Sequence, residues 1–89
     1  MPYSIKKPQP FVIKGEKGDY LIPAMSSLNV DQMGDILTMV PDTPAAEKVA
    51  ITKAFLLRMA PDLKNEDLGD WGYFQIYMAY EKENQNAGK

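Results

Sequence analysis

Few residues in this chain belong to types that do chemistry, and the candidates are acidic. Two pairs of carboxylates could act as general acid and base, namely Asp31 with Asp35 and Glu66 with Asp67. Such catalysis needs two carboxylates in different environments across a cleft, one of them with its pKa raised by burial. These pairs fall instead at an expected helix start and in an expected loop, where solvent and the helix dipole favour negative charge. We therefore expect surface charges and no catalytic pair.

Other common catalytic and metal-binding groups are missing from the composition. The sequence has no cysteine and no histidine, so it offers no thiol nucleophile, zinc-thiolate site or imidazole base. The acidic run at residues 62–67 lacks the alternating oxygen ligands, central glycine and terminal glutamate of an EF-hand loop. We expect a protein that is not an enzyme and that uses no metal, no cofactor and no small-molecule substrate.

The size and charge of the chain limit the classes of partner that it is expected to bind. The 89 residues suffice for one domain (1–89), and the 45% hydrophobic and 25% charged content is typical of a folded protein. The net charge is −2, and Lys6-Lys7 is the one adjacent basic pair, so the clustered positive footprint of a nucleic-acid or lipid-binding surface is absent. No apolar run approaches the roughly 20 residues that span a bilayer. These features favour a protein partner and a cytoplasmic location.

The N-terminal quarter predicts a β-hairpin at residues 10–23. After a proline-rich lead-in (1–9), two short apolar runs flank Gly15-Glu16-Lys17-Gly18, and Pro23 ends the second run. The glycine spacing also fits an RNA-clamping loop, but that loop joins helices, whereas this one joins strands. Residues 3–5 are a candidate for a third strand.

The remainder predicts a helical part over residues 29–84. Asn29 and Gln32 have the spacing of a capping box, and helical periodicity continues to Val40 before Pro41. Thr43 is expected to cap a second helix that has Pro44 as its first residue. No helix breaker follows from Ala45 to Ala60, and Pro61 is expected to end the helix.

The end of the chain predicts one more helix. Residues 62–70 are polar and predict a loop, with a helical turn at 65–68. Asp70 is expected to cap a final helix over 71–84, and residues 85–89 are expected to be frayed. The expected fold is α+β, a hairpin of two or three strands followed by three α-helices.

The final helix is unusually rich in apolar and aromatic side chains. At about 100° per residue they cover an arc of roughly 220°, whereas a surface helix needs an apolar stripe of little more than 100°. The members of the arc are Trp71, Tyr73, Phe74, Ile76, Tyr77, Met78 and Tyr80.

Two arrangements of this arc remain open. The helix could be central and packed on several neighbours, which we favour for Trp71, Phe74 and Tyr77. Alternatively, part of the arc could stay exposed and meet a partner, and Tyr73 and Tyr80 at its margins suit either role, because aromatic residues and Met are enriched in interfaces. The candidate partner-binding residues are Trp71, Tyr73, Phe74, Tyr77, Met78 and Tyr80.

The chain from Lys6 to about Glu83 resembles the small tail assembly chaperones of long-tailed bacteriophages that infect Gram-positive bacteria. The resemblance is carried by residues 6–11, Ile13, the loop 15–18, residues 20–23, Phe55-Leu56, residues 60–63, residues 69–76 and residues 79–81. It implies a protein that binds the tape measure protein in the cytoplasm of the bacterial host and keeps it soluble during tail assembly. The family offers no catalytic residues, and no motif that fixes its binding residues.

A second hypothesis is a structural component of the virion. A tail-completion or head-tail joining protein could self-associate through the free edge of the hairpin, because a strand edge can pair with a neighbouring chain. Presence of the protein in purified virions would favour this alternative over the chaperone.

Overall fold

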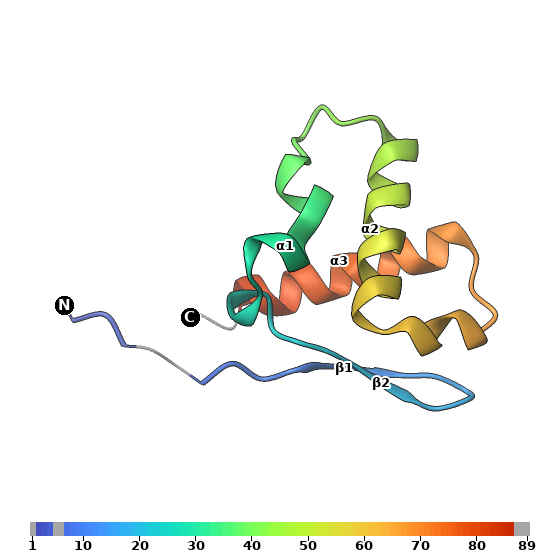
Figure 1. Ribbon diagram of the computed structural model, residues 1–89, viewed down its shortest axis with the longest axis horizontal. Helices are drawn as coiled ribbons and strands as arrows, with labels where there is room; N and C mark the ends of the chain where they lie inside the picture. The colour runs from blue at the N-terminus through green and yellow to red at the C-terminus, as the bar shows by residue number, and fades with distance from the viewer. Residues whose placement is uncertain (1, 5–6, 87–89) are drawn as a thin grey trace.

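The computed structural model describes residues 2–4 and 7–86, and over these residues an N-terminal β-hairpin is followed by three α-helices (Figure 1). The hairpin runs along the lower side of the helices, and α2 (Ala45–Met59) crosses α3 (Asp70–Asn86). The expected α+β class is confirmed. Residues 2–4 and 7–10 extend away from the helices and are exposed.

The hairpin pairs β1 (Phe11–Lys14) with β2 (Asp19–Ile22) in antiparallel register. Its apolar residues alternate between faces, so that Tyr20 and Ile22 are buried while Leu21 between them is exposed. The amide of Gly15 donates to the carbonyl of Gly18 at 2.9 Å and closes the loop. The described residues form a two-stranded sheet. Tyr3 and Ser4 of the candidate third strand are not strand residues, and Ile5 lies outside the described residues.

The capping box at Asn29 is confirmed, but the helix after it is shorter than the periodicity predicts. The amide of Gln32 donates to Asn29 Oδ1 at 2.8 Å, and the Asn29 amide donates to Gln32 Oε1 at 2.9 Å. The helix α1 (Val30–Met33) then ends at Gly34, whose φ of 54° and ψ of −132° lie outside the helical region. A 3₁₀ helix, η2 (Gly34–Thr38), continues the chain.

Helix α2 matches the expected element closely except at its start. It spans Ala45–Met59, and Ala60 separates its end from Pro61. Pro44 is the capping residue and Thr43 provides no cap, because the Thr43 hydroxyl accepts a hydrogen bond from the Val40 amide at 2.9 Å. The Thr43 side chain stabilises the preceding turn instead of the helix.

Two short 3₁₀ helices, η1 (Met25–Ser27) and η3 (Pro61–Asn65), complete the connections. The helical turn after α2 thus begins at Pro61, earlier than the expected 65–68. Asp70 is the first residue of α3, and its carboxylate accepts from Lys53 Nζ at 2.8 Å. Helix α3 also continues to Asn86, so residues 85–86 are helical, contrary to the expected fraying, and residues 87–89 lie outside the described part.

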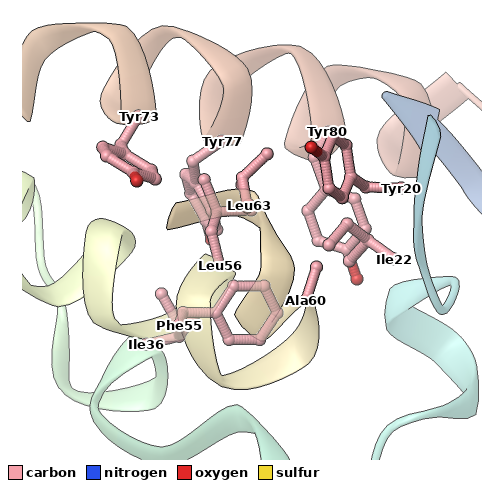
Figure 2. Close-up of a cluster of buried hydrophobic side chains, with 10 residues drawn as sticks. All are labelled: Tyr20, Ile22, Ile36, Phe55, Leu56, Ala60, Leu63, Tyr73, Tyr77 and Tyr80. Atoms are coloured by element: carbon pink, nitrogen blue, oxygen red, sulfur yellow. The ribbon is translucent and has the colours of Figure 1, made fainter. Parts of the chain in front are cut away.

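The core lies where α2, α3 and the inner face of the hairpin meet (Figure 2). Phe55 contacts the rings of both Tyr77 and Tyr80, with centroid separations of 5.8 Å in each case. Such edge and tilted aromatic contacts add about 0.5–1.5 kcal/mol each beyond burial. The buried residues of this core cluster are Tyr20, Ile22, Ile36, Phe55, Leu56, Ala60, Leu63, Tyr73, Tyr77 and Tyr80.

Candidate protein-binding surface

One side of α3 is buried in the core. Tyr73, Tyr77 and Tyr80 are 4%, 1% and 0% exposed, and their spacing of four and three residues places them on one helical face. Figure 2 shows all three rings pointing from α3 toward α2 and the hairpin. The three tyrosines of this helix therefore belong to the core that holds the domain together.

The polar groups on this side tie α3 to the segment after the hairpin. Tyr80 donates its hydroxyl to the carbonyl of Pro23 at 2.7 Å. One turn later, Asn84 Oδ1 accepts from the Met25 amide at 2.7 Å, while its Nδ2 donates to the Tyr80 carbonyl at 2.8 Å. The residues that follow β2 are thus fixed against the last turns of α3.

The tyrosine hydroxyls are not acid or base groups at ordinary pH. Burial raises the pKa of Tyr80 to about 12. Burial also raises the pKa of Tyr77, and the carboxylate of Glu81 raises it further. Both phenols are therefore neutral across the physiological range and act as packing groups and hydrogen-bond partners.

Glu66, in the loop between η3 and α3, holds the tip of the hairpin. Its carboxylate accepts the Tyr20 hydroxyl at 2.6 Å and the amides of Glu16 and Lys17 at 3.0 and 2.9 Å. The hydrogen bond from Tyr20 lowers the pKa of Glu66 most, with the two amides contributing. Glu66 is thus a partly exposed carboxylate that also has a structural role in holding the hairpin. Its three donors come from residues about 50 positions earlier, so no local pattern marks it.

The other side of α3 carries apolar residues that the core does not use. Trp71 is 60% and Met78 46% exposed, and Phe74 between them is partly buried. The spacing i, i+3, i+7 places these three on one face, and the Trp71 and Phe74 ring centroids lie 5.1 Å apart. We call Trp71, Phe74 and Met78 the exposed stripe. It has the size and spacing of the anchors that one helix presents to another.

A shallow groove on α2 reaches α3 at Asp70, the residue before Trp71. Lys53 and Asp70, which both line the groove, form a salt bridge of 2.8 Å, and Lys53 Nζ lies 5.4 Å from the centroid of the Tyr73 ring. The groove is lined mainly by apolar side chains of α2. Its lining residues are Ala46, Val49, Ala50, Lys53, Ala54, Leu57 and Asp70.

The structure divides the predicted partner-binding residues into two groups. Trp71 and Met78 are exposed and Phe74 is partly exposed, whereas Tyr73, Tyr77 and Tyr80 are buried. The preference for a core position is thus correct for Tyr77 and wrong for Trp71. The margin residues Tyr73 and Tyr80 are not available for contact, because α2 and the hairpin cover the side of α3 on which they lie.

Two other classes of site are not found within residues 2–4 and 7–86. No group of three or more acidic, histidine or cysteine side chains there is placed to hold a metal ion. None of the helices in the same residues is long and apolar enough to cross a bilayer.

Comparison with known proteins adds no relative. The chain matches no family model, no curated protein and no solved structure.

Proposed function

We propose that this protein is a tail assembly chaperone of a long-tailed bacteriophage. In this proposal it acts in the host cytoplasm, binds the tape measure protein, keeps that protein soluble while the tail is built, and catalyses no reaction. The proposed biological role comes from the resemblance of residues 6–83 to these chaperones. The exposed stripe on α3 is the observation that carries the binding activity.

The exposure of Trp71 to water has a cost in free energy that a partner could remove. A tryptophan that is 60% exposed beside a partly exposed phenylalanine leaves apolar surface in water, and burial of such surface contributes about 25 cal/mol per Å². Tryptophan is also among the residues that contribute most to binding in protein interfaces. A partner that covers the stripe would gain this free energy without any rearrangement of the core.

The shape of the stripe favours a helical partner segment. Its three residues lie along two turns of α3, which matches the i, i+3, i+7 pattern of helix-on-helix recognition. Met78 at one end has an unbranched, adaptable side chain that can pack against varied sequences. A chaperone that must hold successive helices of one long protein needs this tolerance.

Co-expression with the tape measure protein tests the proposal. The double variant Trp71→Ser, Met78→Ser should leave most of the tape measure protein insoluble, whereas the wild type should keep it in solution. The matched control is Val12→Ser, Leu21→Ser, which removes two exposed apolar residues from the outer face of the hairpin. Equal solubility with all three proteins, or with no chaperone, would contradict the proposal.

Purified virions distinguish the alternative role. A tail-completion or joining protein would be present in finished particles, and both edges of the hairpin, which the described residues leave unpaired, offer it a route to self-association. Under the chaperone proposal, finished particles contain none of this protein. Detection at a fixed stoichiometry in particles would replace the chaperone with the structural role.

A further inference from the structure

The tip of the hairpin directs three hydrogen-bond donors at a single carboxylate, that of Glu66. The Glu16 amide donates to Oε1 at 3.0 Å, and the Lys17 amide donates to Oε2 at 2.9 Å. The Tyr20 hydroxyl donates to Oε2 at 2.6 Å, so both carboxylate oxygens have a donor. Successive backbone amides that point at one anion form the kind of concavity in which proteins bind anionic groups.

Gly15 leaves open the space that this carboxylate fills. A β-carbon at this position would lie 2.5 Å from Glu66 Cδ and 2.7 Å from each of the two carboxylate oxygens. Side chains do not approach this closely, so any residue other than glycine would exclude the carboxylate. We define the carboxylate site as the amides of Glu16 and Lys17, the hydroxyl of Tyr20 and the open space at Gly15.

The surroundings of the carboxylate site give a ligand access to it. A hollow between the hairpin and the segment that precedes α3 is open to solvent, and Gly15 and Glu66 are among the residues that line it. Its lining also includes Lys14 and the acidic residues Glu16 and Asp67. These charges partly cancel, so the three aimed donors, and not a net positive charge, determine what the site binds.

We infer that the tip of the hairpin is a binding site for a carboxylate, which Glu66 occupies in the folded domain and which a free carboxylate occupies when that side chain is absent. Because Glu66 belongs to the same chain, its effective concentration at the site is high, and a free anion competes poorly with it in the wild type. A carboxylate from outside must displace Glu66, so its binding and the docking of the hairpin tip exclude one another.

Acetate is the matched probe, because Glu66→Ala removes a methylene group and a carboxylate, which is the fragment that acetate restores. Sodium acetate should replace sodium chloride at constant ionic strength while NMR follows the amide signals of Glu16 and Lys17. In Glu66→Ala these two signals should shift and saturate. The unfolding constant should also fall, by about elevenfold when acetate is at ten times its Kd.

Two double variants separate binding from the general effect of acetate on protein stability. In Gly15→Ala, Glu66→Ala the added β-carbon takes the place of the carboxylate, so neither amide signal should respond. In Tyr20→Phe, Glu66→Ala the Kd for acetate should rise about tenfold or more, because the shortest of the three hydrogen bonds is lost. Asp67→Ala removes the neighbouring exposed acid but keeps Glu66, and it should respond like the wild type.

The inference is overturned if the Glu16 and Lys17 signals of Glu66→Ala do not respond to acetate, or if acetate stabilises Glu66→Ala and Gly15→Ala, Glu66→Ala equally. If Glu66→Ala is unfolded in chloride, acetate should restore its helical circular dichroism, and failure to restore it would equally overturn the inference. No phage component is present in these measurements, so a negative result leaves the chaperone proposal unchanged.

Discussion

The hydroxyl of Tyr20 donates to the Glu66 carboxylate at 2.6 Å, which joins the second strand of the hairpin to the loop before α3. The same carboxylate accepts two amides of the hairpin loop. At the opposite end of the hairpin, Tyr80 is hydrogen-bonded to Pro23. The small sheet is thus fixed to the helical part at its tip and at its base.

The Glu66 contacts predict how stability depends on acid. Because the pKa of Glu66 is lowered in the folded state, its stabilising contribution is complete above the ordinary glutamate value of 4.5 and is lost as the pH falls through the lower, folded-state value. Glu66→Gln should lower the urea midpoint at neutral pH and reduce the loss of stability between about pH 5 and pH 3. Asp67→Asn, at the exposed neighbour, is the control. An unchanged acid dependence in Glu66→Gln would show that the carboxylate charge is unimportant.

The buried tyrosines predict unfolding in alkali. Tyr20 and Tyr80 have folded-state pKa values raised from 10.0 to about 12, Tyr20 mainly by its hydrogen bond to Glu66 and Tyr80 by burial. Their contribution to stability is present below pH 10 and is lost as the pH rises toward about 12. Ionisation of Tyr20 and Tyr80, monitored by phenolate absorbance, should therefore accompany the loss of helical circular dichroism. Ionisation of these two tyrosines near pH 10 in a protein that stays folded would contradict this assignment.

The two sides of α3 predict serine substitutions that destabilise the domain to very different extents. Tyr80→Ser should cost about 3–5 kcal/mol, because it removes a ring packed against Phe55 and Phe11. Trp71→Ser should cost about 1 kcal/mol or less, since most of its ring already contacts water. Urea denaturation followed by circular dichroism measures both. Similar losses from the two substitutions would mean that Trp71 belongs to the core.

The break after α1 predicts a requirement for glycine. Gly34→Ala should destabilise the domain by about 1–3 kcal/mol, because a side chain strains this backbone conformation. A β-carbon there would also lie 2.5 Å from Arg58 Nη1. The control is Gly69→Ala, where the structure leaves open space and the φ angle is not positive, so stability should rise by about 0.4–1 kcal/mol. Equal effects at both glycines would exclude this role for the backbone angle.

The sequence predicted the positions of the strands and helices better than it predicted which side of each helix is buried. Propensity and the position of Pro61 place the hairpin and α2 to within a residue or two, and the capping box places the start of α1 at Asn29, because these signals act locally. The long arc on the last helix is different, since periodicity identifies apolar residues but not the direction from which neighbours cover them. That direction depends on how α2 and the hairpin pack, which buries Tyr73 and Tyr80 and leaves Trp71 in solvent.

Trp71 is the single tryptophan of the chain and lies in the stripe proposed to bind the tape measure protein, so its fluorescence reports directly on the central claim. Titration with a tryptophan-free helical fragment of the tape measure protein should shift the emission to shorter wavelength and saturate, because the ring passes from water into an apolar interface. The Met78→Ser variant should need a higher concentration of the fragment to reach saturation. Binding that leaves the emission unchanged, or no binding at all, would contradict the account.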